Sequence, residues 1–312
     1  MSSGAGPLCL WLEVTNPEAT TLLRCPSPRR LSGRVEAFVT VLSVSIVCLF
    51  VSSTTFATDH AVKNKKILLL SQSPDGHPRM THEYAAGMRI MEKCLASVSG
   101  VEVKHVNADR PWPEGPELIR DADCVVMFLS EGARWTHEDP RRIEAFAQLA
   151  ARGGAFLTLH WGMGTKEARY IDGYLKLFGG CHGGPDRKYK VLDAEVAIAT
   201  KDHPITRGIE NFSIHEEFYY QLKLVAASNQ LKPILQTEID GEAQTVAWAW
   251  QRGDGGRSFG FSGGHFHENW GRAEYRRLMT QAVLWALDLP IPEAGVNVDI
   301  EPGVLQLPAG DR

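Results

Sequence analysis

Three short, continuously apolar segments constrain the fold of this chain more than any other feature. They lie at residues 65–71, 124–129 and 155–160 and read KKILLLS, CVVMFL and AFLTLH. A strand that is apolar along its whole length has both faces buried, which is typical of a parallel sheet covered by helices on both sides. Segments with helical periodicity lie at residues 81–97 and 140–152, so strands and helices alternate. The first half of the domain is therefore predicted to be α/β with a parallel sheet.

Predicted strands outnumber helices in the second half. Asp240-Gly241 is a typical hairpin turn between two of them. Apolar residues recur at helical spacing over residues 273–287, which predicts a closing helix. Residues 290–312 form a Pro-rich tail that is expected to pack loosely. The strands predicted in this half cover residues 194–199, 233–237, 244–250 and 258–262.

Residues 1–57 differ from the rest and are predicted to be a leader that ends in an export signal. A basic region precedes an apolar stretch at residues 37–51, and small residues follow it up to Ala57. This order is that of a secretory signal peptide cleaved after Ala57, which would make the protein periplasmic or secreted. The alternative is an uncleaved membrane anchor at residues 37–57, although about 20 apolar residues are usual for a span. Residues 58–289 would be the folded domain.

Charge and motifs exclude several classes of function. The 33 basic and 37 acidic residues give a net charge of −4, so the chain lacks the basic field expected of a nucleic-acid-binding protein. The sequence contains no G-x-G-x-x-G motif and no P-loop, so we expect no nucleotide cofactor. A serine nucleophile elbow, G-x-S-x-G, is also absent.

Histidines are the candidate catalytic residues. All 11 follow Ala57, and most lie beside glycines or at predicted strand ends. Ligands of α/β sheets bind beyond the carboxyl ends of the strands, which marks His77, His82, Ser130, Glu131 and His160 by position. His265 joins His82 and His160 as a candidate because it lies beside glycines, near the end of a predicted strand. Histidine moves protons near neutral pH and is a common metal ligand. The three histidines are therefore candidates for acid–base catalysis beside a carboxylate, and for binding a divalent metal such as zinc or manganese. The candidate carboxylates are Glu216 and Glu217.

Aromatic and further histidine side chains are candidates for binding substrate. Aromatic faces stack on the apolar faces of sugar rings. Trp248 and Trp250 alternate on a predicted strand and are equally consistent with core packing. The spacing of His265 and His267 places them on one face of a strand, or in a loop where spacing implies nothing. The candidate binding residues are Trp161, His182, His215, Tyr219, His267 and Trp270.

Several of these segments together resemble the ThuA-like (trehalose utilisation) family. They read GGAFLTLHWG, LFGGCH, DHPITRGI, HEEFYY and QTVAWAWQRGDGGRSFGFSGGHFHENW, in this order. The resemblance implies a class I glutamine amidotransferase-like fold, which is a flavodoxin-like three-layer α/β sandwich with a mostly parallel central sheet. His82, His265 and the segment from Glu216 to Tyr219 match positions of the family. The resemblance also implies a substrate among disaccharides and their 3-keto derivatives.

The resemblance argues against thiol chemistry at the expected elbow. True class I amidotransferases have a cysteine after the central strand, whereas this chain is similar to the ThuA-like group in having His160 there. The leading hypothesis is therefore an exported enzyme that acts on a sugar or keto-sugar. The second hypothesis is a non-catalytic carbohydrate-binding module, and the third is a thiol hydrolase that uses Cys181. The expected partner is a small carbohydrate, a membrane is expected only through an uncleaved N-terminus, and the oligomeric state stays open.

Overall fold

The computed structural model describes residues 64–226 and 230–309 of the 312 residues. The chain divides into two units, of which the second spans Asp59–Arg312 and contains all the elements described below. The predicted leader at residues 1–57, with its export signal or anchor, lies outside the described residues. Within the described ranges no helix is both long and apolar enough to cross a bilayer.

The strands of the domain agree with the predicted apolar segments and extend beyond them. The parallel strands are β1 (Lys65–Ser71), β2 (Val101–Asn107), β3 (Cys124–Met127), β4 (Ala155–Leu159) and β12 (Arg257–Phe261). The antiparallel strands are β7 (Lys188–Ile198), β8 (Phe212–Tyr220), β10 (Leu231–Ile239) and β11 (Glu242–Gln251). Three two- to four-residue strands form a separate small sheet: β5 (Gly164–Thr165), β6 (Gly180–Gly183) and β9 (Lys223–Leu224).

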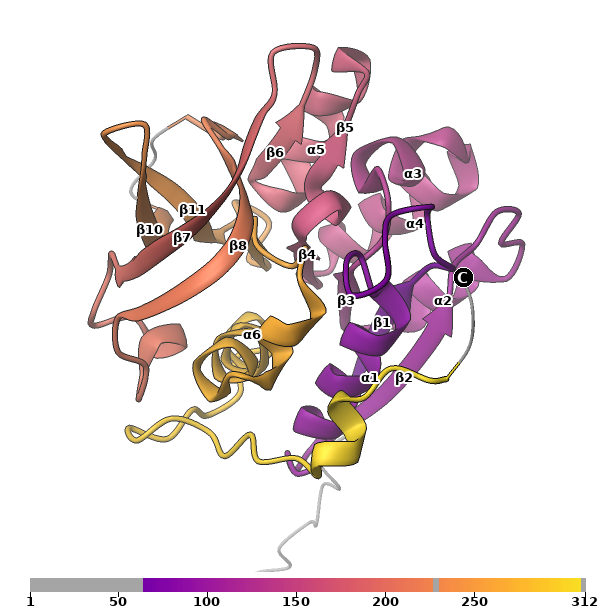
Figure 1. The fold of residues 1–312 in the computed structure, drawn as a ribbon. Helices are drawn as coiled ribbons and strands as arrows, with labels where there is room; N and C mark the ends of the chain where they lie inside the picture. Colours follow the sequence, from indigo (N-terminus) through magenta and orange to yellow (C-terminus); the bar gives the residue numbers. More distant parts are fainter. Residues whose placement is uncertain (1–63, 227–229, 310–312) are drawn as a thin grey trace, which may run out of the picture. The chain divides into compact units, whose positions relative to one another are not determined.

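The nine long strands form one sheet in the order β2-β1-β3-β4-β12-β11-β10-β7-β8 (Figure 1). The five strands from β2 to β12 run parallel, and the other four extend the sheet in antiparallel fashion. β8 pairs with β7 from Tyr220 opposite Lys188 to Phe212 opposite Val196, and it ends the sheet. The carboxyl ends of β1, β4 and β12 therefore meet at one edge of the sheet.

Helices cover both faces of the parallel strands, which confirms the predicted three-layer α/β sandwich. Ile67 and Leu69 of β1 belong to the core on the side of two helices, whereas Leu68 and Leu70 belong to the core on the other side. This alternation follows from the two-residue period of a strand and explains why residues 67–70 of β1 are all apolar. The helices on the first side are α1 (Tyr84–Leu95) and α6 (Ala273–Ala286). Those on the second side are α2 (Gly115–Asp121), α3 (Gly132–Glu138), α4 (Pro140–Ala151) and α5 (Ile171–Phe178). Single 3-10 turns lie at η1 (His160–Met163), η2 (Ala168–Tyr170), η3 (Pro204–Thr206), η4 (His267–Gly271) and η5 (Pro302–Leu305).

The C-terminal tail packs more closely than its sequence indicates. Ile291, Val296 and Val298 are buried although they lie in irregular chain. Arg276 of α6 donates from Nε to the Val298 carbonyl at 2.9 Å, and Arg277 donates to the Val296 carbonyl at 3.1 Å. These two hydrogen bonds hold the first part of the tail, residues 291–298, against α6, so this part packs more closely than expected, whereas residues 301–309 are mostly exposed.

Candidate active site

A pocket of about 330 Å³ opens at the carboxyl ends of β1, β4 and β12. The antiparallel strands β7 and β8 contribute Tyr189, Glu217 and Tyr219 to its wall. This is the edge at which α/β sheets bind ligands. The lining residues are His77, His82, Trp161, Lys166, His182, Arg187, Tyr189, Glu217, Tyr219 and His265.

His160 lies beneath this pocket, on a tight turn that directly follows β4. Its φ is 47°, in the left-handed region, and its side chain is 0% exposed. The turn leaves no room for larger neighbours: a Cβ on Gly162 would lie 2.7 Å from the Met127 carbonyl oxygen, and one on Gly264 would lie 2.9 Å from the His160 Cβ. The chain therefore has an elbow at the place predicted from the sequence. The elbow residue contacts His82 and Tyr219, which line the pocket, and is not itself exposed to it.

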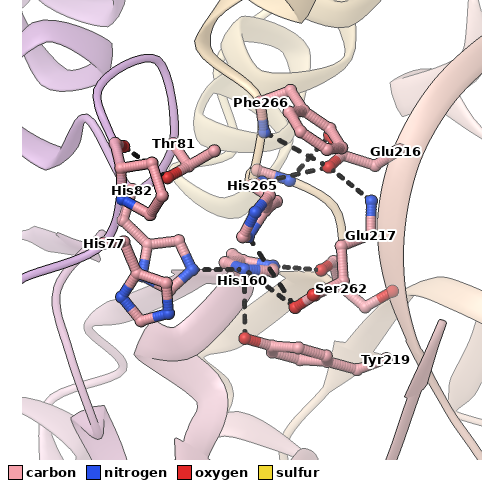
Figure 2. Close-up of polar contacts among 12 residues, drawn as sticks. His77, Thr81, His82, His160, Glu216, Glu217, Tyr219, Ser262, His265 and Phe266 are labelled. Atoms are coloured by element: carbon pink, nitrogen blue, oxygen red, sulfur yellow. Dashed lines mark hydrogen bonds and ion pairs between the residues drawn. The ribbon is translucent and has the colours of Figure 1, made fainter. Parts of the chain in front are cut away.

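The His160 ring is oriented by hydrogen bonds on both nitrogens (Figure 2). Its Nδ1 lies 2.8 Å from the Ser262 carbonyl, which can only accept, so Nδ1 carries a proton. Its Nε2 accepts from the Tyr219 hydroxyl at 3.0 Å and lies 3.0 Å from Nε2 of His82. Burial, followed by the neighbouring His82, holds the pKa of His160 well below its usual range, so the ring is neutral at physiological pH.

His82 is fixed by a carboxylate that the sequence analysis did not identify. Its Nδ1 lies 2.9 Å from Oδ2 of Asp75, and the Tyr84 hydroxyl donates to the same oxygen at 2.7 Å. Burial opposes the charge on Asp75, but hydrogen bonds led by that from His82 outweigh it and hold the pKa of this carboxyl well below its usual range. The backbone N–H of His82 donates to the His265 carbonyl at 2.9 Å, which ties together the loops after β1 and β12.

The two adjacent glutamates of β8 face opposite sides of the strand and have different surroundings. Glu217 lines the pocket, and its Oε1 lies 3.7 Å from Nε2 of His160 and 3.8 Å from Nδ1 of His265. Glu216 is 0% exposed and accepts from the backbone N–H groups of Gly264 at 3.0 Å and His265 at 3.1 Å. Burial raises the pKa of each glutamate to about 7. Glu217 can therefore meet a ligand, whereas Glu216 holds the loop that positions His265.

The structure brings most of the predicted residues together. His82, His160 and His265, here called the histidine cluster, each offer a ligand nitrogen, and these atoms lie within 4.8 Å of one another. Burial lowers the pKa of His265 to about 4, which leaves its ring neutral at physiological pH. Tyr219 stacks on His182 with ring centroids 3.8 Å apart, and Trp161 meets His182 edge-on at 5.7 Å. These aromatic and histidine rings form the inner wall of the pocket.

Three predicted binding residues lie outside the lining of this pocket. His215 is on the exposed part of β8, where its Nδ1 lies 2.8 Å from a carboxylate oxygen of Asp193. His267 is buried, and its Nε2 donates to the Leu305 carbonyl of the tail at 2.9 Å. Trp270 is 1% exposed and belongs to the core beneath α1 and α6. All three were expected to bind substrate because they lie close in the sequence to residues that do line the pocket.

The cysteine hypothesis gains no support from the geometry. Cys181 is 0% exposed and is absent from the pocket lining. Burial raises the pKa of its thiol to about 12, so the nucleophilic thiolate is not formed near neutral pH. Trp248, which could have been a binding residue, is also 0% exposed and donates from its ring nitrogen to the Phe178 carbonyl at 2.9 Å.

The fold and the histidine-lined pocket define a three-layer α/β sandwich protein with a mostly parallel central sheet. A family model described as "ThuA: Trehalose utilisation" matches residues 66–286, so the chain belongs to the ThuA family. A solved ThuA-like protein from Bacteroides uniformis is 15% identical, with a TM-score of 0.55 over 74% of this chain and 95% of that one.

Two further solved structures are less similar. A cytoplasmic protein from Salmonella typhimurium is 14% identical, with a TM-score of 0.49 over 71% of this chain and 98% of that one. A glutamine amidotransferase from Thermotoga maritima is 10% identical, with a TM-score of 0.41 over 72% and 99%. No match was found among curated proteins. At these identities the solved structures inform the fold alone.

Proposed function

We propose that this ThuA family member is an exported enzyme that acts on a disaccharide or its 3-keto derivative. The observation that supports this most directly is the histidine cluster beside Glu217 at the base of a pocket. Family membership supplies the link to sugar utilisation, since its model is described by trehalose utilisation. The order of basic, apolar and small residues up to Ala57 supports export.

The proposed chemistry is acid–base catalysis by Glu217 and the cluster. Glu217 lies within 4 Å of both His160 and His265, so a substrate in the pocket would meet a carboxylate and an imidazole on the same side. In a 3-keto sugar the C–H bond next to the carbonyl is acidic. A base can remove that proton, the adjacent glycosidic C–O bond then breaks, and an acid returns a proton to the departing oxygen. A divalent metal held by the cluster would polarise the carbonyl during this step.

The outer part of the pocket is suited to binding the rest of a saccharide. Trp161 and Tyr189 both line it, and Tyr189 is 60% exposed, so its ring is accessible to a ligand. Arg187 and Lys166 add hydrogen-bond donors to the same part of the lining. Aromatic surface combined with donors is the usual arrangement for recognising sugar rings and their hydroxyl groups.

These aromatic residues also favour the alternative, a module that binds carbohydrate without changing it. Incubating the full chain with trehalose, sucrose and their 3-keto forms separates the two functions. We expect product to form, and we expect His265→Ala to reduce turnover by at least about 100-fold, the lower range for loss of an acid or base. His215→Ala is the matched control, because that histidine lies outside the pocket. Saturable binding with intact ligand would instead establish the binding module, and equal turnover in both variants would refute the assigned site.

A further inference from the structure

The two central nitrogens of the histidine cluster lie close enough together to bind one ion. Nδ1 of His160 donates to the Ser262 carbonyl, and Nδ1 of His82 lies 2.9 Å from a carboxylate oxygen of Asp75. The nitrogen that each ring directs toward the other is therefore Nε2. These two Nε2 atoms lie 3.0 Å apart in a buried space, and the Tyr219 hydroxyl lies 3.0 Å from that of His160 (Figure 2).

A shared proton or a metal ion can bridge these two nitrogens, and the rest of the cluster favours a metal. A proton bridges two nitrogens only. Here His265 is a third nitrogen ligand within 4.8 Å, and its Nδ1 is buried without a hydrogen-bond partner among the described residues. Glu217 approaches from the pocket side at 3.8 Å from that nitrogen. Three imidazole nitrogens and one carboxylate oxygen thus lie close together at the base of the pocket.

We propose that His82, His160 and His265 form a mononuclear site for a divalent zinc ion, with Asp75 and the Ser262 carbonyl as its orienting partners. Nitrogens bound tetrahedrally to one zinc ion at about 2.0–2.1 Å lie roughly 3.3–3.4 Å apart, close to the observed separation of the two Nε2 atoms. Metal-binding histidines typically donate their other ring N–H to a carboxylate or a backbone carbonyl, as His82 and His160 do. Three imidazoles favour zinc over manganese, which prefers oxygen ligands.

The surroundings of the site favour a catalytic metal over a structural one. Structural zinc sites are closed by four protein ligands, whereas catalytic sites have three and keep one position open. His82 and His265 both line the pocket, so the open position would face it, next to Glu217. The elbow after β4 holds His160 on the side of the cluster away from the pocket, and a side chain that binds a metal there needs no access to solvent. The inference deepens the proposed function, because this metal would be the one that polarises the sugar carbonyl.

Metal content of the full chain tests the site without reference to turnover. The protein is stripped with a chelator and dialysed, zinc chloride is added, and bound zinc is measured by elemental analysis and by titration calorimetry. We expect about one zinc ion per wild-type chain, with the same stoichiometry and affinity for His215→Asn, the matched control. His82→Asn and His160→Asn should abolish stoichiometric binding. Asparagine is chosen because both histidines have positive φ, which asparagine tolerates.

Asp75→Asn provides a second measurement that does not remove a ligand. Loss of an orienting partner typically weakens metal affinity about 10- to 100-fold, and we expect a decrease of that size. Circular dichroism of each metal-free variant verifies that it is folded. A wild-type chain that binds no more zinc than His160→Asn would overturn the proposal, as would unchanged affinity in Asp75→Asn. Sugar turnover without bound metal would refute this inference alone, whereas tight zinc binding without turnover would refute only the proposed enzyme function.

Discussion

Replacing Glu216 should separate its structural role from the role of its neighbour. The carboxylate is 0% exposed, and its Oε2 accepts from the Gly264 N–H at 3.0 Å and from Asn269 Nδ2 at 3.1 Å. Its Oε1 accepts from the N–H groups of Glu217 at 2.8 Å and His265 at 3.1 Å, with a longer contact of 3.4 Å to that of Phe266. Glutamine preserves one oxygen and places an NH₂ group where the other oxygen was. Two buried donors then lose their acceptor.

The expected cost follows from those two donors. A buried donor without an acceptor costs about 1–3 kcal/mol, and removing a buried charge offsets part of the sum. We therefore expect Glu216→Gln to lower the free energy of unfolding by about 1–3 kcal/mol, and Glu216→Ala, which removes both oxygens, by about 3–5 kcal/mol. Urea unfolding followed by tryptophan fluorescence measures both.

Glu217→Gln is the matched control for this experiment. Its carboxylate faces the pocket, so the free energy of unfolding should stay within about 0.5 kcal/mol of wild type while sugar turnover falls. If Glu216→Gln were as stable as wild type, the carboxylate would not be what holds the loop of His265, and the reasoning would fail.

Three further predictions concern the elbow, the tail and a histidine outside the site. Gly162→Ala should lower the free energy of unfolding, measured in urea, by about 2–4 kcal/mol, because its Cβ would meet the Met127 carbonyl. Gly253→Ala is the control: no described atom lies within 4 Å of its added Cβ, so the free energy of unfolding should change by less than about 0.5 kcal/mol. Deleting residues 301–312 removes the carbonyls of Leu305 and Pro308 that accept from His267 and Arg79, and should lower the Tm by about 2–8 °C in calorimetry; an unchanged Tm would contradict a bracing role of the tail. Burial lowers the pKa of His203 to about 4 in the folded chain, so between about pH 6.5 and pH 4 the unfolded chain binds a proton that the folded chain does not. This difference should lower the free energy of unfolding by about 1–2 kcal/mol between pH 7 and pH 5. In His203→Asn the decrease in the free energy of unfolding over the same pH range should be smaller by about 1–2 kcal/mol.

The parallel half of the fold could be predicted because its strands are buried on both faces. Such strands have apolar residues throughout, so the segments that become β1, β3 and β4 stand out without an alignment. β8 was not predicted, although its inward positions are occupied by Phe212, Ile214, Glu216 and Phe218. A buried glutamate in that series interrupts the apolar alternation by which a strand is recognised. The buried Glu216 that hid β8 in the sequence is also the residue that binds the backbone of Gly264 and His265 at the candidate site.

Site residues that directly follow a strand could be predicted from the sequence. Residues that reach the site only through contacts between distant loops could not. The rule that ligands bind at the carboxyl ends of strands selected His77, His82 and His160, and the glycines beside His265 added the third member of the cluster. Asp75 was missed because Ser73-Pro-Asp-Gly76 has the composition of an ordinary turn, and only the fold shows its contact with His82. The difference between Glu216 and Glu217 needed only the two-residue period of a strand, once the strand itself was known.

The elbow after β4 determines how His160 could take part in the proposed site. A positive φ is strained for a residue that has a Cβ, so this turn costs conformational free energy that the surrounding contacts must offset. His160 is fully buried, bonded on Nδ1 to Ser262 and in contact with His82, so in the proposed site it would act through a neighbour or through an ion that the neighbours share. A ligand would therefore meet the side of the cluster that lines the pocket, where Glu217 lies 3.7 Å from Nε2 of His160.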